Sequence, residues 1–197
     1  MSEETAIKEV VKNASELFTP TMISNLYTMT ASAKKDARQA LPASPRIPQA
    51  DVRMLRARLI LEEAFETVKG LGVEIACDVP IISSLKDLSL HIRPEENGGI
   101  VPNLEDIIDG ACDTIYVATG TLAACGVPDV PHLLAVSKAN DEKFPNGVAT
   151  VDEFGKFVKP SGWVAPNHAR TSASLPDCLR AAGGLAGVGN ALVESVR

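Results

Sequence analysis

Residues 55–66 read Leu-Arg-Ala-Arg-Leu-Ile-Leu-Glu-Glu-Ala-Phe-Glu, and this stretch decides the fold expected for the chain. Its apolar residues recur at helical spacing. Glu62 and Glu66 are four residues apart and Glu63 and Glu66 are three apart, so the three side chains converge on a helix. Like charges at that spacing repel each other unless a cation lies between them. The stretch therefore predicts a helix with a site for a cation.

A second acidic pair, Asp109 and Asp113, repeats this pattern on another apolar segment. The surrounding residues expected to be buried are Ile107, Ile108, Ala111, Cys112, Ile115 and Tyr116. No lysine or arginine occurs from Pro94 to Ser137. A charge run on a helix is more often a solvated face, and one such cluster would be weak support for anything else. Two clusters, the second without a basic neighbour, favour a hard divalent metal held by carboxylates.

Composition excludes several classes of protein. A chain of 197 residues fits one domain with extensions and can bury a core. Its net charge of −6 argues against a general nucleic-acid partner, and no apolar run approaches the ~18 residues of a membrane span. The four cysteines form no C-x-x-C pair, which indicates small buried side chains in a reducing compartment. With an acidic N-terminus, this predicts a cytoplasmic location without a membrane partner.

Hydrophobic periodicity and breaker residues predict a mainly helical chain. Three segments are expected: an N-terminal part of helices and a Pro-rich linker over 1–49, a central domain with both acidic clusters over 50–166 and a loosely held tail over 167–197. The expected helices are 3–18, 21–38, 51 to 70 or 72, 103–125 and 129–140, with a short helix at 185–196. Short strands are expected at 79–83 and 88–93, and a loop at 155–163.

The two acidic stretches, 55–66 and 109–120, resemble the metal-binding helices of the all-α nucleoside-triphosphate pyrophosphohydrolases. This superfamily includes the MazG-like and phosphoribosyl-ATP-pyrophosphohydrolase-like proteins. A third stretch, 137–144 with Gly155, Lys156, Pro160 and Trp163, resembles the lysine-bearing end of the latter branch. The resemblance covers residues 50 to 166. It implies an all-α, MazG-like helical bundle completed by oligomerisation, with a short irregular or β-containing insert at 73–102 and a C-terminal loop region.

The resemblance also implies a reaction and roles for its residues. It implies Mg²⁺-dependent cleavage of a nucleoside or deoxynucleoside triphosphate to monophosphate and pyrophosphate, with Mn²⁺ as a substitute, in a homodimer or homotetramer. The expected metal ligands are Glu63, Glu66, Asp109 and Asp113, and Glu62 is expected to orient or deprotonate the water. The residues expected to contact substrate phosphates or ribose are Lys138, Asn140, Lys143, Lys156 and Lys159. Trp163 is expected to fill a docking groove at an interface.

One departure affects the second motif. The superfamily pattern is E-x-x-D, but alignment of its aspartate with Asp113 puts Gly110 at the glutamate position. Asp109 is one residue earlier and one methylene shorter, so both direct and water-mediated metal contact stay open for it. Alternatives are a phosphoribosyl-ATP pyrophosphohydrolase of histidine synthesis, a non-catalytic nucleotide- or metal-binding regulator, and a helical interaction module. Turnover with Mg²⁺ separates the enzymes from the other two.

Overall fold

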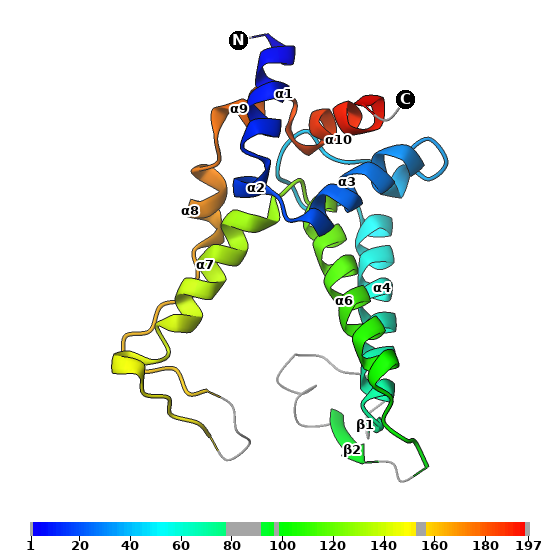
Figure 1. Ribbon diagram of the computed structural model, residues 1–197, viewed down its shortest axis with the longest axis vertical. Coiled ribbons are helices and arrows are strands. Elements are labelled where there is room, and N and C mark those ends of the chain that lie inside the picture. Colours follow the sequence, from blue (N-terminus) through cyan, green and yellow to red (C-terminus); the bar gives the residue numbers. More distant parts are fainter. Residues whose placement is uncertain (1, 78–91, 97–98, 153–156, 196–197) are drawn as a thin grey trace. The chain divides into compact units, whose positions relative to one another are not determined.

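The computed structural model describes residues 2–77, 92–96, 99–152 and 157–195, and these residues are mainly helical, as predicted (Figure 1). They form two compact units. Unit 1 comprises residues 1–48 and 119–197, and unit 2 comprises residues 49–118. The predicted limit between residues 49 and 50 lies one position from the first limit of unit 2. The predicted limit between residues 166 and 167 corresponds to no boundary between the units.

Unit 1 is built from short helices around a small apolar core. Its elements are α1 (Glu3–Lys12), α2 (Ala14–Leu17), α3 (Pro20–Ser32), η1 (Ala37–Gln39), α7 (Asp129–Asp141), η2 (Pro145–Gly147), α8 (His168–Ala173), α9 (Asp177–Ala181) and α10 (Gly184–Ser195). Helix α10 packs along α3, and α1 contacts α9, as Figure 1 shows near the two termini. The side chains of Met22, Leu26 and Leu185 are fully buried there.

The start of the chain differs from the predicted helix over 3–18. The helix is interrupted at Asn13, and α3 begins at Pro20 instead of after it. Proline has no N–H to lose at the first helical position, and the Thr19 hydroxyl accepts a hydrogen bond from the Met22 N–H. Thr19 also donates its hydroxyl to the Asp129 carboxylate, which accepts the Thr19 N–H at 3.0 Å. Asp129, predicted to cap the helix over 129–140, is the first residue of α7 and joins it to α3.

The C-terminal segment is not the loosely held tail predicted over 167–197. It forms three helices, and its residues Leu175, Leu179, Leu185 and Val188 are buried. The prediction failed because alanine and glycine, which suggested a weak tail, here allow close packing. A Cβ on Gly189 would lie 2.1 Å from the Thr30 hydroxyl oxygen and 2.9 Å from Leu41 Cδ1. The segment is therefore part of the core of unit 1.

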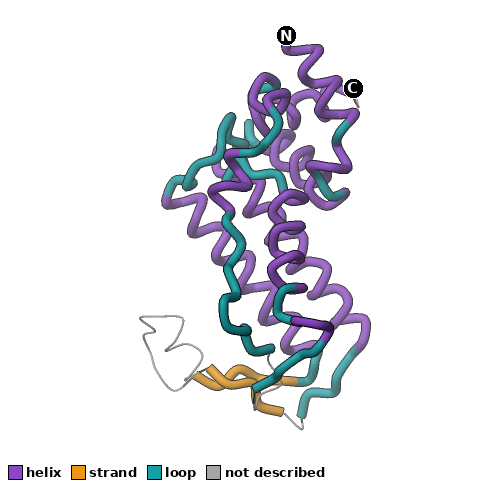
Figure 2. The backbone as a smooth tube through the Cα atoms, turned by 90° about the vertical axis from the view of Figure 1, so that its left-hand side faces the viewer, coloured by secondary structure: helices purple, strands orange, loops and turns teal. Residues whose placement is uncertain are grey.

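Unit 2 contains α4 (Ala50–Gly70), the first turns of α6 (Leu104–Ala124) and a two-stranded sheet. Strands β1 (Val73–Cys77) and β2 (Ile92–Glu96) pair antiparallel, with Val73 opposite Glu96 (Figure 2). β1 lies before the predicted strand at 79–83, which falls outside the described residues, and β2 overlaps the end of the one predicted at 88–93. Helix α6 starts after Asn103, as predicted, because the Asn103 side chain accepts the Glu105 N–H at 3.0 Å.

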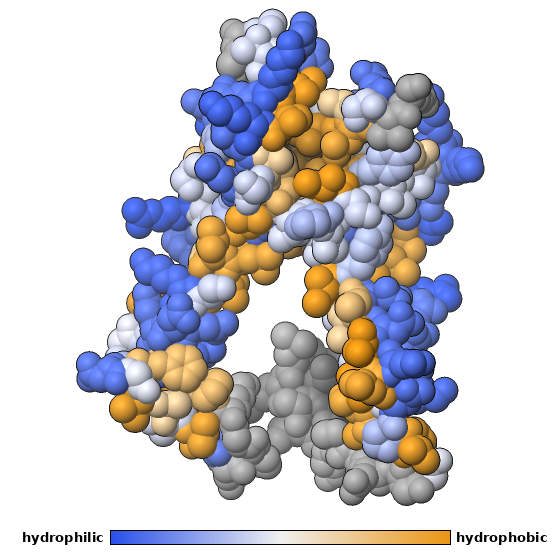
Figure 3. All heavy atoms as spheres, viewed as in Figure 1, coloured by the Kyte–Doolittle hydropathy of each residue, from blue (hydrophilic) through white to orange (hydrophobic). Residues whose placement is uncertain are grey.

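The apolar surface predicted to be buried around Asp109 and Asp113 is partly exposed. Ile108 and Ile115 are 55% and 59% exposed, and Cys112 is exposed. Figure 3 shows hydrophobic residues along α6, beside the hydrophilic surface of α4. The prediction was wrong for these three residues because α6 contacts α4 through its small residues instead. Among the described residues, no helix is both long and apolar enough to cross a membrane.

We predict that Leu185→Ala destabilises the protein by about 2–4 kcal/mol, because it opens a cavity where α10 meets the rest of unit 1. Urea unfolding followed by circular dichroism measures this change. Leu104→Ala is the control, since Leu104 is 70% exposed and its truncation is expected to change stability by less than about 0.5 kcal/mol. Equal effects of the two substitutions would show that the C-terminal helices contribute no core.

Candidate functional site

The two acidic helices meet at a glycine. A Cβ on Gly110 of α6 would lie 2.7 Å from the Thr67 hydroxyl oxygen and 2.9 Å from the Thr67 Cα, closer than any side chain tolerates. The Thr67 hydroxyl donates to the Glu63 carbonyl oxygen at 2.8 Å, and it lies 3.4 Å from the Thr114 hydroxyl. Gly110 therefore lets α4 and α6 touch beside Glu63. This explains why a glycine stands where the resembling superfamily has a glutamate.

This contact brings the predicted acidic residues into one electrostatic cluster. Burial is the largest cause that raises the pKa of Glu63, and the negative charges of neighbouring carboxylates raise it further. Those carboxylates, in order of their effect, belong to Asp113, Glu66, Glu62 and Asp109. The structure thus places the other four predicted acidic residues, including Asp109, within reach of the Glu63 charge.

Countercharge near the cluster is weak. Among the described residues, Arg58 is the only cation that forms an ion pair with one of the five acidic residues. Its Nε lies 3.9 Å from the Glu62 carboxylate, and both side chains are exposed. An exposed pair of this kind contributes about 0–1 kcal/mol. Lys69, which the sequence analysis missed, lines a hollow of about 230 Å³ with Glu66, Asp106, Asp109 and Gly110. Its spacing of three from Glu66 was the signal that could have indicated it.

The five carboxylates are suitable ligands for a hard divalent metal, but their present positions do not form a metal site. Carboxylate oxygens are the ligands that Mg²⁺ takes in proteins. As they stand, no three His, Cys, Asp or Glu side chains in the described part of the chain are arranged to hold an ion. The carboxylates lie on facing turns of two helices in contact, and side-chain rotation alone changes their spacing. An ion would have to draw these side chains together against the repulsion described above.

The predicted phosphate-binding residues gather near the end of α7, in unit 1. Lys143 donates to the Asn140 side-chain oxygen at 2.8 Å, and Lys143 and Lys159 lie 5.6 and 4.5 Å from the centre of the Trp163 ring. Lys138 is exposed on the same helix, and Lys156 lies outside the described residues. The structure therefore brings Asn140 and two of the lysines together, whereas the acidic cluster belongs to unit 2.

Trp163 docks on its own chain. Its indole N–H donates to the Ala139 carbonyl oxygen at 2.6 Å, so it fixes the loop after Pro160 on α7. Phe157 packs edge-to-face on Phe144 with ring centres 4.8 Å apart, as expected of packing anchors. Trp163 thus makes its hydrogen bond within the chain, and its place at an interface stays a prediction.

Two histidines to which the sequence analysis gave no role form a second link to α7. The Nδ1 atoms of His132 and His168 are 3.1 Å apart, and His132 Nε2 lies 3.3 Å from the Ser172 hydroxyl oxygen. Burial, and to a smaller extent His168, lowers the pKa of His132. The pair holds α8 on α7, and a sequence separation of 36 residues gives no local signal for it.

Comparison with known proteins agrees with this arrangement. The family model described as phosphoribosyl-ATP pyrophosphohydrolase matches residues 28–140, more than half of the chain. The match contains both acidic helices and most of α7. It indicates a pyrophosphohydrolase that acts on nucleotides, and the family is all-α. No curated protein matches the chain significantly.

We predict that the metal-free protein loses stability as the pH rises above the ordinary Glu63 value of 4.5. The raised pKa means that the folded protein binds this proton more tightly than the unfolded chain. The stabilisation is therefore present below 4.5 and is lost as the pH rises through the pKa of the folded state. Glu63→Gln should melt at a higher temperature than the unsubstituted protein at pH 7 in EDTA, and this difference should vanish below 4.5.

The matched control is Glu9→Gln, on the exposed side of α1, for which no pH-dependent difference is expected. Thermal melts across the pH range measure all three proteins. A Glu63→Gln protein that melts at or below the wild-type temperature at pH 7 would show that charge repulsion at Glu63 does not destabilise the fold.

Proposed function

The chain belongs to the phosphoribosyl-ATP pyrophosphohydrolase family, and we propose that it cleaves nucleoside or deoxynucleoside triphosphates between the α and β phosphates with Mg²⁺. The products are a nucleoside monophosphate and pyrophosphate. The observation that carries the proposal is the acidic cluster on α4 and α6, where four neighbouring carboxylates act on Glu63 beside the Gly110 contact. Such a cluster gains most from a divalent ion, because the ion replaces mutual repulsion by attraction.

Each acidic residue has a proposed role. Glu63, Glu66, Asp109 and Asp113 would hold one or two Mg²⁺ ions, and Mn²⁺ would substitute. When bound, the metal polarises a phosphoryl oxygen and lowers the pKa of an attacking water. We assign to Glu62 the role of orienting this water and taking its proton. Glu62 is next to Glu63 in the sequence, and its ion pair with Arg58 is long and exposed, which leaves its carboxylate available.

The basic residues near the end of α7 have the complementary role. Lys138, Lys143 and Lys159, together with Asn140, would contact the substrate phosphates, and we assign Lys156 to the same group from its sequence position. A leaving pyrophosphate carries more charge than a leaving phosphate, so several lysines stabilise it better than one. The ammonium groups of Lys143 and Lys159 both lie over the Trp163 ring in the structure. Either of them would exchange this contact for one to a substrate phosphate.

Phosphoribosyl-ATP is the second candidate substrate, and the family description favours it. It would use the same carboxylates on a larger nucleotide. We keep the simple triphosphates first because residues 1–27 and 141–197 lie outside the family match and add helices to the chain. Rates on the eight common nucleoside and deoxynucleoside triphosphates and on phosphoribosyl-ATP, measured side by side with Mg²⁺, separate the two candidates.

We predict that Glu66→Gln and Asp113→Asn each lower turnover by about 100-fold or more while the protein stays folded. Each change removes a charged oxygen ligand but keeps the shape of the side chain. Rates at saturating Mg²⁺ and circular dichroism spectra measure the effect. Asp51→Asn, in the first turn of the same α4, is the control and should keep its activity. Wild-type turnover by Glu66→Gln would exclude the assignment of Glu66 as a metal ligand.

The same assay determines which bond breaks. Chromatography of a partial digest should show monophosphate and pyrophosphate from the start, without a diphosphate intermediate. Diphosphates should be poor substrates, because their leaving group lacks most of the charge that the lysines hold. Accumulation of nucleoside diphosphate with free phosphate would contradict the proposed bond and leave a general metal-dependent phosphatase.

We also propose that a second copy of the chain covers the exposed apolar surface of unit 2, in a homodimer or a homotetramer. The apolar side chains exposed on it are Leu61 and Phe65 on α4 and Ile108 and Ile115 on α6, each at least half exposed. Apolar residues that recur along two neighbouring helices are typical of an interface, unlike scattered single residues.

We predict a solution mass of at least twice the 20.8 kDa of one chain. Ile115→Ser should shift the protein toward monomer at micromolar concentration, because it replaces apolar surface that the second copy would bury. Light scattering after size-exclusion chromatography measures both. Ile47→Ser is the control, since Ile47 is 82% exposed in the linker before α4 and is not part of this surface. A folded wild-type monomer would contradict the proposed assembly.

A further inference from the structure

A cavity of about 540 Å³ lies within unit 1, between α7 and residues 164–174. Ala135, Lys138, Ala139 and Glu142 line one wall. The other wall consists of Val164, Ala165, Pro166, Asn167, Arg170, Thr171 and Ser174, all outside the family match. Its size falls in the range of sites for small organic ligands, about 300–1,000 Å³. The cavity therefore joins a helix of the family to a segment that this chain adds.

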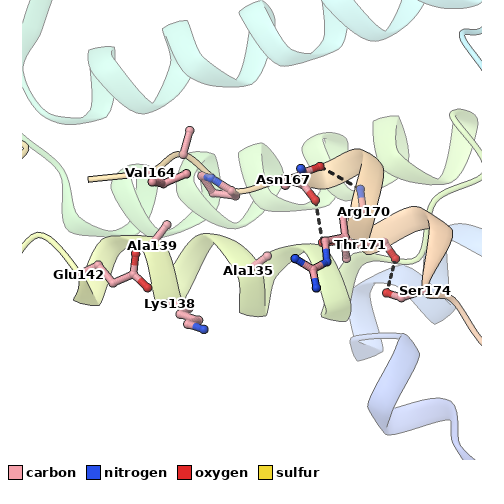
Figure 4. A pocket seen from close by; sticks show the side chains of 11 residues that line it. Ala135, Lys138, Ala139, Glu142, Val164, Asn167, Arg170, Thr171 and Ser174 are labelled. Atoms are coloured by element: carbon pink, nitrogen blue, oxygen red, sulfur yellow. Dashed lines mark hydrogen bonds between the residues drawn. The ribbon is translucent and has the colours of Figure 1, made fainter. Parts of the chain in front are cut away.

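Two cations on this cavity are available to a ligand. Lys138 and Arg170 have no ion pair and no side-chain hydrogen bond among the described residues. Figure 4 shows their head groups on either side of Ala135. A guanidinium binds phosphate through two parallel N–H donors, and an ammonium adds a point charge. A phosphate group is the ligand that fits this pair.

The backbone that carries Arg170 is fixed before any ligand binds. The Asn167 side-chain oxygen accepts the Arg170 N–H at 2.9 Å, and the Thr171 hydroxyl donates to the Asn167 carbonyl oxygen at 3.1 Å. The His132–His168 pair holds the same helix on α7. Trp163, bound to the Ala139 carbonyl oxygen, anchors the residue before Val164. Ordering of this wall thus costs little on binding, which favours affinity.

Glu142 determines which phosphate compound fits. Its carboxylate lines the same cavity and is not paired with Lys138, although the two residues are four apart on α7. Figure 4 shows the two side chains turned apart. A carboxylate repels a polyphosphate but accepts hydrogen bonds from the hydroxyl groups of a sugar. A ligand with a phosphate at one end and hydroxyls at the other satisfies both walls.

We propose that this cavity binds a ribose 5-phosphate group, with the phosphate on Lys138 and Arg170 and the sugar hydroxyls on Glu142. The proposal rests on the proposed function only for the choice of a nucleotide-derived sugar. Two sources share this chemistry, the nucleoside monophosphate product and the phosphoribosyl group of phosphoribosyl-ATP. In both cases Arg170 is a ligand-binding residue that lies beyond the family match.

Direct binding tests the proposal without turnover. Ribose 5-phosphate is titrated into the full-length protein by calorimetry and by fluorescence of Trp163, the single tryptophan of the chain, which hydrogen-bonds to the cavity residue Ala139. Saturable binding is expected, and Arg170→Gln or Lys138→Gln should weaken it about 10-fold or more. Arg180→Gln is the matched control, because Arg180 is an exposed arginine of the same unit that pairs with Asp177. It should bind like the wild type.

Inorganic phosphate and Glu142→Gln test the second half of the proposal. Glu142→Gln should weaken ribose 5-phosphate binding but leave phosphate binding equal or tighter, since it replaces a charged hydroxyl acceptor by a weaker neutral one and removes a repelling charge. Tighter binding of AMP than of ribose 5-phosphate indicates the monophosphate product as the source, and equal binding indicates the phosphoribosyl group. Absence of wild-type binding to ribose 5-phosphate, or equal affinity in Arg170→Gln and Arg180→Gln, overturns the proposal. A protein that binds but hydrolyses nothing would instead contradict the proposed function alone.

Discussion

The close approach of α4 and α6 at Gly110 and Thr67 is the constraint on which the candidate site depends. No side chain larger than hydrogen fits at position 110, so the two helices touch at the turn that carries Glu63, Glu66 and Asp113. Without this contact the carboxylates would be two separate solvated faces, which is the more common outcome for charged helices. With it, burial and then the charges of neighbouring carboxylates raise the pKa of Glu63, which leaves a position for positive charge.

Packing and charge thus oppose each other in unit 2. The helix contact uses small residues and hydroxyls, Gly110, Thr67 and Thr114, and it leaves large apolar side chains such as Phe65 and Ile115 exposed. The same contact concentrates negative charge with little compensation from Arg58. A divalent ion would neutralise the concentrated negative charge. A second copy of the chain would cover the exposed apolar side chains. On this proposal the stability of unit 2 would depend on its ligands more strongly than that of unit 1, where Asp129 and Leu185 are already fully buried.

The sequence predicted the features that depend on local periodicity, but not those that depend on tertiary packing. Capping rules predict that α6 starts after Asn103 and ends before Gly126. The structure confirms both, and Gly126 has a positive φ. The tail after Asn167 was misjudged because glycine and alanine indicate weak helices locally, whereas Gly189 packs tightly against Thr30. Spacing alone indicated the acidic residues, yet it could not show that Gly110 brings them together. Arg170 and the His132–His168 pair had no sequence motif, since the elements that they contact are distant in sequence.

The extent of the family match separates reaction chemistry from ligand choice. All five acidic residues lie within 28–140, and cleavage of a phosphoanhydride requires little of a protein beyond fixed charge and an oriented water. Arg170, Pro166 and Val164 lie outside the match, and they form the wall of the cavity on α7. A chain that adds helices at both ends of a small catalytic unit can change what it binds without moving its carboxylates. If the proposed cavity binds a sugar phosphate, the segment after Trp163 would determine which ligand this protein selects.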